Sequence, residues 1–214
     1  SGDEQEYQAF IDDAFIQILS REASNLIIDL RNNGGGDDSF SDYLVAYLAT
    51  EPFKWNARFS LRTSRLLQDN TREHRDLQNP YWKSIMENPV GTRYEYDFGY
   101  KQPVNWKRRF TGKVYTLINR HSHSQASVTA AQIQDYKLAT IVGEETGDYP
   151  SLYASQFQYV LPKTGITVKI SKGHIVRVNG SQAERGVIPN ISIADHLLDE
   201  QDEILDGLLQ YITE

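Results

Sequence analysis

The sequence predicts a layered α/β fold. Two short runs of mostly branched apolar residues, 25–30 and 113–118, have the length and composition of strands that are buried on both faces. Each run leads through a glycine-rich or polar loop into a segment with the apolar spacing of a helix. Because strands that alternate with helices are typical of sheets covered by helices, we expect a single domain that spans residues 1–214.

The first strand is flanked by helices. Apolar side chains at helical spacing predict an amphipathic helix over residues 5–20. The strand at 25–30 ends in a loop over 31–38, whose three consecutive glycines permit backbone conformations that other residues adopt only at a cost. Helical spacing resumes over 40–48, which completes a helix–strand–loop–helix unit.

Residues 52–110 differ from the rest of the chain. They contain all three tryptophans and clusters of arginine, aspartate and asparagine, and they show no sustained period. Local helices are predicted near 62–69 and 80–87. We interpret this segment as an insertion or lid over the core.

Regular spacing returns after the insertion. The second buried strand, 113–118, leads through the polar loop 119–124 into a predicted helix at 125–136, and a third strand follows at 138–142. Further strands are predicted at 154–161, 165–171 and 174–178, with a final amphipathic helix through 204–212.

The composition argues against several classes of function. The formal net charge is −7, and no basic stripe is present, so we expect no nucleic-acid partner and no attraction to anionic membranes. The absence of cysteine excludes a thiol nucleophile, a disulfide framework and a thiolate metal site. No apolar run reaches the roughly 18 residues that a membrane span needs. Ser1-Gly2-Asp3 is not the start of a signal peptide, and we expect the natural protein to extend upstream.

Ser124 is the sharpest candidate for chemistry. It lies after a buried strand and directly before a predicted helix, where free backbone N–H groups can hold a developing oxyanion and the helix dipole favours negative charge. The alternative interpretation is that Ser122 or Ser124 only caps the helix, since serine is a favoured cap residue.

The glycine run Gly34–Gly36 follows the other buried strand and can present N–H groups to an anion. It is not a phosphate-binding loop, because no Gly-Lys-Ser/Thr follows at the required spacing, and it does not match a dinucleotide fingerprint. Taken alone, the glycine run is better explained as a tight turn.

Three blocks of sequence together resemble one known family. They are Leu26-Ile-Ile-Asp-Leu-Arg-Asn-Asn-Gly-Gly-Gly36; Val114–Asn119 with Ser122-His-Ser124, Gln134-Asp-Tyr136 and Ala139–Gly147; and Gly186-Val-Ile-Pro-Asn190. Their order and content are similar to those of the tail-specific, or C-terminal-processing, serine peptidases and of the related tricorn core. The resemblance covers about residues 25–190, except for the segment between the first two blocks.

This resemblance implies a fold and a set of roles. The fold would be the superhelix of strand–helix units that this family shares with Clp peptidase and crotonase proteins, with the inserted segment as a lid. Ser124 would be the nucleophile of a peptidase catalytic domain. The N–H of Gln125 and that of Gly35 or Gly36 would form the oxyanion hole. Acyl transfer to water through a serine ester would be the reaction, with no cofactor and no metal.

The general base is the point at which the match fails. The tail-specific branch uses a lysine after the Gly-Glu-x-Thr block, but Tyr149 stands there, and a tyrosine is a poor base at neutral pH. The tricorn-like branch uses a histidine upstream of the glycine signature, and no histidine precedes Gly34. If that mechanism applies, we expect the base upstream of Ser1 and Glu184 as the carboxylate that orients it, although a solvated turn residue is the alternative for Glu184.

The chain's own histidines offer weaker alternatives. His123 adjoins Ser124, but neighbouring side chains in extended backbone point in opposite directions. His121 lies in the same loop and could fold back, and His174 lies on a late strand. His74 and His196 are interpreted as surface residues, and no pair of histidines has metal-ligand spacing beside carboxylates.

Two rival functions remain open at this stage. A catalytically inactive relative could bind peptides or proteins through the aromatic residues of the insertion, and a crotonase-like acyl-CoA enzyme could share the fold. For the peptidase, the expected partner is a peptide or an unfolded protein substrate. The family resemblance implies an exported, periplasmic bacterial protein, while the oligomeric state is not determined by the sequence.

Overall fold

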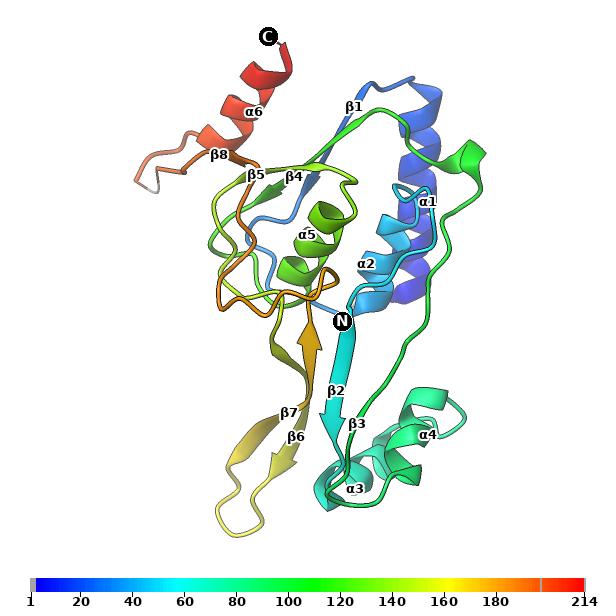
Figure 1. Ribbon diagram of the computed structural model, residues 1–214. Helices are drawn as coiled ribbons and strands as arrows, with labels where there is room; N and C mark the ends of the chain where they lie inside the picture. Colours follow the sequence, from blue (N-terminus) through cyan, green and yellow to red (C-terminus); the bar gives the residue numbers. More distant parts are fainter. Residues whose placement is uncertain (1–2, 197, 214) are drawn as a thin grey trace.

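The computed structural model describes residues 3–196 and 198–213, which form two four-stranded sheets (Figure 1). The first sheet is parallel, with the order β1-β4-β5-β8. The second is antiparallel, with the order β3-β2-β7-β6. The predicted α/β class is confirmed, and the structure has an antiparallel sheet beside the parallel one. The strands are β1 (Asn25–Asp29), β2 (Arg58–Arg62), β3 (Arg93–Glu95), β4 (Lys113–Ile118), β5 (Thr140–Gly143), β6 (Tyr153–Val160), β7 (Thr167–Val176) and β8 (Ile191–Ser192).

Helices cover both faces of the parallel sheet. Side chains alternate along β4, so Val114 and Ile118 pack with residues of α1, α2 and α5, whereas Leu117 packs on the other face with Ile204 and Leu208 of α6. Because both faces of β4 are covered, apolar side chains occur at successive positions along this strand. The helices are α1 (Glu4–Ser20), α2 (Asp38–Val45), α5 (Gln125–Asp135) and α6 (Glu203–Thr213). No helix among the described residues has the length and apolar character needed to cross a bilayer.

The segment 52–110 is joined to the second sheet. Its strand β2 pairs with β7, more than 100 residues later in the chain, and with β3 of its own segment. Its helices α3 (Arg65–His74) and α4 (Pro80–Glu87) pack beside this sheet at the lower end of the molecule in Figure 1, and a short 3-10 helix, η1 (Trp106–Arg108), precedes β4. Helix α3 begins later than predicted because the Ser64 hydroxyl accepts the Leu67 N–H and caps it there.

The second sheet has its own core of aromatic and aliphatic side chains. Trp55 and Phe59 pack there with Tyr81 of α4, Ile175 of β7 and Val128 of α5. Because Val128 belongs to the helix that begins after Ser124, this aromatic core reaches the helix that carries the candidate nucleophile.

The predicted break between two late strands is wrong. The sequence predicted separate strands at 165–171 and 174–178, but β7 continues through the intervening residues. Gly173 pairs with Leu61 on one side and Ala154 on the other, so hydrogen bonding to two neighbouring strands keeps the chain extended. A Cβ at Gly173 would lie 2.4 Å from the Phe59 ring, which shows that the glycine provides space for packing rather than a turn.

Candidate active site

The loops that follow β1 and β4 lie together because these strands are parallel neighbours, and the carboxyl ends of parallel strands meet at one edge of a sheet. Hydrogen bonds hold the two loops in register. The Asn119 side chain accepts the Asn32 N–H at 3.1 Å and donates to the Asn32 side chain at 3.1 Å. The buried Ser122 hydroxyl donates to the Leu30 carbonyl at 2.8 Å, and the His123 N–H donates to the Asn33 carbonyl at 2.9 Å.

Ser124 lies at the N-terminus of α5 in an unusual backbone conformation. Its φ of 51° and ψ of −122° are rarely adopted by a residue with a side chain. Such a conformation costs on the order of 1–3 kcal/mol and is found most often at functional sites. The Ser124 side chain makes no capping hydrogen bond, so the structure gives no support to the interpretation that this serine is only a cap.

Gly35 lies directly against Ser124. It has φ of +99°, and a Cβ added there would lie 2.6 Å from the Ser124 Cβ and 2.9 Å from the Gln125 nitrogen. Real Cβ atoms essentially never make contacts this short, so glycine is required for the close approach of the two loops. The structure therefore places the glycine loop close to Ser124 and Gln125.

Two backbone donors beside Ser124 are open. The N–H groups of Gly36 and Gln125 donate to no other described residue, whereas the Gly35 N–H donates to the Asn33 side chain at 2.8 Å. Gln125 is the first residue of α5, where the N–H lacks an intrahelical acceptor and the helix dipole is positive. Of the three predicted oxyanion donors, Gly36 and Gln125 are thus the two whose N–H groups are free.

Asp148 is a neighbour of Ser124 that sequence reasoning missed. Its carboxylate accepts the Ser124 N–H at 2.6 Å and lies 3.5 Å from Nδ1 of His123. Asp148 follows Gly147, and a Cβ at Gly147 would lie 2.3 Å from the His123 ring, so this glycine lets the aspartate approach. The available sequence signal is the position of Asp148 directly after the Gly143–Gly147 block and one residue before Tyr149.

The closing turn that begins at Gly186 forms hydrogen bonds with the loop after β5. The Gly186 N–H donates to the Glu145 carboxylate at 2.8 Å, and the Val187 N–H donates to the Thr146 hydroxyl at 2.8 Å. The Thr146 hydroxyl in turn donates to the Asp148 carbonyl at 2.9 Å. These contacts connect the closing turn to the loop that holds the Ser124 backbone.

The other predicted site residues are not brought to Ser124. Glu184 is exposed, forms no hydrogen bond or ion pair within the described part of the chain, and lines neither cavity beside Ser124. His121 is exposed. His174 packs against Tyr153, and burial together with Arg58 lowers its pKa. No side chain of the described residues hydrogen-bonds to the Ser124 hydroxyl, so its general base is not identified by these contacts.

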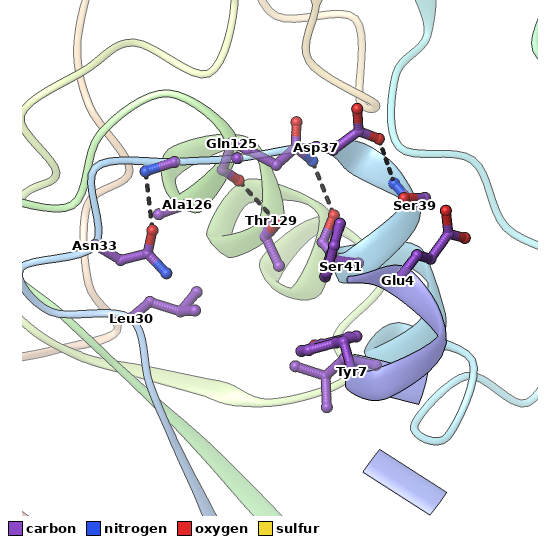
Figure 2. A pocket seen from close by; sticks show the side chains of 14 residues that line it. Glu4, Tyr7, Leu30, Asn33, Asp37, Ser39, Ser41, Gln125, Ala126 and Thr129 are labelled. Carbon is purple, nitrogen blue, oxygen red and sulfur yellow. Dashed lines mark hydrogen bonds between the residues drawn. The ribbon is translucent and has the colours of Figure 1, made fainter. Parts of the chain in front are cut away.

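Two cavities flank the glycine loop. One, of about 790 Å³, lies between the loop and helices α1 and α2; Figure 2 shows Tyr7, Leu30 and Gln125 around it, with the Gln125 side chain donating to Ser41 at 2.9 Å. The other, which we call the aromatic cavity, has a volume of about 580 Å³ and includes Ser124 itself. Its walls include Ser124, Gln125, Gly36, Trp55, Phe59, Tyr81, Trp82, Tyr96 and Phe98.

Among the ionisable groups of the aromatic cavity, a carboxyl group and an ammonium group have shifted pKa values. Burial, with added repulsion from Asp37 and Asp42, raises the pKa of Asp38 to about 6. Burial and the neighbouring Arg75 lower the pKa of Lys172 to about 8. Clusters of perturbed groups inside a cavity are typical of functional sites.

One group of possible metal ligands occurs among the described residues. The ligand atoms of His196, Asp199 and Glu203 lie within 4.8 Å of one another at an exposed turn. His196 hydrogen-bonds to Asp199 at 2.9 Å and its N–H donates to Glu203 at 3.1 Å, so contacts within the turn account for the cluster.

The chain is similar in sequence and in fold to known proteases. The sequence profile of peptidase family S41 matches residues 4–193. A tail-specific protease of Haemophilus influenzae is 22% identical over 185 residues, which cover 84% of this chain and 22% of that protein. Mature CPAF superposes with a TM-score of 0.64 and 20% identity, covering 98% of this chain and 45% of that chain. A photosystem II D1 C-terminal processing protease superposes with a TM-score of 0.57 and 19% identity, covering 98% of this chain and 44% of that chain. The chain therefore spans less than half the length of these relatives.

Proposed function

The chain belongs to peptidase family S41, a family of serine peptidases, and from this premise we propose that it hydrolyses peptide bonds through an acyl-enzyme on Ser124. The observation that carries the proposal is the strained Ser124, with an uncapped side chain that lines a cavity beside two open backbone donors. In a serine peptidase, a residue of this kind is the nucleophile.

In the proposed reaction, the Ser124 oxygen attacks the carbonyl carbon of the substrate while a base removes the hydroxyl proton. The N–H groups of Gly36 and Gln125 stabilise the negative charge that develops on the carbonyl oxygen. The C–N bond then breaks, and the amine leaves with the proton. Water attacks the resulting ester, which releases the acid and restores Ser124. Gly35 contributes space rather than a hydrogen bond, and Asp148 fixes the serine backbone.

We propose that the base belongs to a part of the natural protein upstream of Ser1, as in the tricorn-like arrangement, with Glu184 as its carboxylate partner. Two observations support this. The Ser124 hydroxyl has no basic partner among the described residues, and the Glu184 side chain is exposed and not engaged by another described residue. The proposed substrates are peptides or unfolded C-terminal tails, in line with the names of the relatives. We propose an exported location, as the resemblance to the tail-specific peptidases implies.

Covalent labelling by a fluorophosphonate tests the nucleophile. The probe is applied to this chain and to the full-length natural protein, each with Ser124 intact or replaced (Ser124→Ala), and exposed Ser20→Ala is the matched control. We expect labelling of the full-length protein that the Ser124 variant loses and the Ser20 variant keeps. If the isolated chain is silent while the full-length protein is labelled, the base lies outside this chain.

Peptide binding without catalysis is the second candidate function, because no described side chain acts as a base on the Ser124 hydroxyl. If the folded full-length protein takes up no probe, the peptidase proposal fails, and a peptide-binding relative that uses the aromatic cavity becomes the better interpretation. Family membership gives no support to an acyl-CoA enzyme.

A further inference from the structure

The aromatic cavity contains a buried lysine that forms no ion pair with a described residue, although the charge of Asp37 attracts it through space. Lys172 is 8% exposed and lines this cavity, yet it forms no hydrogen bond or ion pair with any described residue. A buried ammonium group is costly unless an anion or hydrogen-bond acceptors surround it. Asp37 and Asp38 line the same cavity, but neither forms an ion pair with Lys172 among the described contacts.

A second cation contacts the same indole ring. The Lys172 ammonium is 4.5 Å from the centroid of the Trp82 ring, and the Arg75 guanidinium is 4.7 Å from the same centroid. Cation–π contacts stabilise each group, but the two positive charges also repel one another. An anion in the cavity that both residues line would relieve this repulsion.

The cavity offers a further unused donor. The indole N–H of Trp55 is buried and has no hydrogen-bond partner within the described structure. Buried polar groups are nearly always paired, so an unpaired donor in a cavity wall indicates an acceptor supplied by a ligand. Lys172, Arg75 and Trp55 all line the cavity that includes Ser124.

The strand pairing of β6 with β7 is irregular opposite Lys172. Ala154 pairs with Gly173 and Gln156 pairs with Ser171, so Ser155 falls opposite Lys172. Ser155 has φ of 59°, which interrupts regular pairing at this point of β6.

We propose that Lys172 and Arg75, stacked on Trp82, form a subsite for a carboxylate of the peptide that binds at Ser124. This proposal rests on the proposed peptidase function, because the cavity is shared. The carboxylate is either the side chain of an aspartate or glutamate or the free C-terminus of the peptide, and these two sources present the same group to the two cations.

Binding of matched peptides tests the subsite without catalysis. The full-length protein with Ser124→Ala is titrated with peptides that differ only by glutamate against glutamine, or by a free against an amidated C-terminus. We expect one pair to differ by about 10- to 100-fold in Kd, as for charge-assisted hydrogen bonds. The pair that differs identifies the source of the carboxylate.

Variants then assign the preference to these side chains. Lys172→Met in the Ser124→Ala protein is expected to reduce the difference to less than about 3-fold while uncharged peptides keep their affinity. Lys169→Met, an exposed lysine on the same strand, is the matched control and should change nothing. If Lys172→Met does not fold, Arg75→Gln at an exposed position decides the same question.

Three outcomes overturn the subsite: no peptide binds, neither pair differs, or the difference survives both Lys172→Met and Arg75→Gln. Fluorophosphonate labelling of the unsubstituted protein reports on the nucleophile separately. Carboxylate preference without labelling would refute hydrolysis and leave the subsite intact, whereas labelling without the preference would do the reverse.

Discussion

Replacing Gly35 with alanine tests whether the glycine loop positions Ser124. The new Cβ would lie 2.6 Å from the Ser124 Cβ, about 0.8 Å short of the 3.4 Å at which ordinary contact begins, so one loop must move. The φ of +99° adds strain of about 1–2 kcal/mol for a residue with a side chain. Because the loop is exposed, we expect the free energy of unfolding to fall by no more than about this amount.

The effect on chemistry should be larger than the effect on stability. A displacement of nearly 1 Å moves Ser124 or the Gln125 N–H, and misplacement on this scale costs roughly 100-fold in rate. The assay is the rate of fluorophosphonate labelling, measured beside the urea midpoint. Gly34→Ala is the matched control, since no atom lies within 4 Å of its added Cβ. Equal labelling rates for the two variants would refute the role assigned to Gly35.

Three further changes have defined outcomes. Asp148→Ala should lower the labelling rate of Ser124 about 10-fold, because it releases the Ser124 backbone. Asp148→Asn should keep most of the labelling rate, because its amide oxygen can accept the same N–H; an equal loss in both variants would show that the charge of Asp148 matters rather than its position. Burial lowers the pKa of Lys172 to about 8, so the folded state disfavours the charged form of this side chain. Lys172→Met should therefore raise the free energy of unfolding at pH 7, and this gain should shrink from pH 8 to above pH 10. Urea titrations in which the free-energy difference between the two proteins stays constant with pH would contradict this. The same titration should remove part of the carboxylate preference between pH 7 and pH 9. Arg177→Met should lower the free energy of unfolding, measured with urea, by about 3 kcal/mol, because it leaves the largely buried Asp135 carboxylate without its bidentate partner. A loss below about 1 kcal/mol would show that solvent screens this ion pair.

Local sequence determined the elements that carry the candidate site. The branched apolar run at 113–118 is a strand because its alternate side chains are buried on opposite faces, and it forms β4 as predicted. The position of Ser124 between this strand and a helix followed from the same pattern. These features were readable because each depends on residues close together in the chain.

Tertiary structure decided what surrounds Ser124. Gly35 and Ser124 meet only because β1 and β4 are parallel neighbours, and a parallel pairing leaves no local signal of its register. Asp148 accepts a hydrogen bond from the Ser124 backbone, and its place after Gly147 in the sequence does not identify this partner. The cation pair on Trp82 depends on the packing of α3, α4 and β7 in the second core. Long-range contacts of this kind are selected by the fit of whole surfaces, and a single sequence does not display that fit.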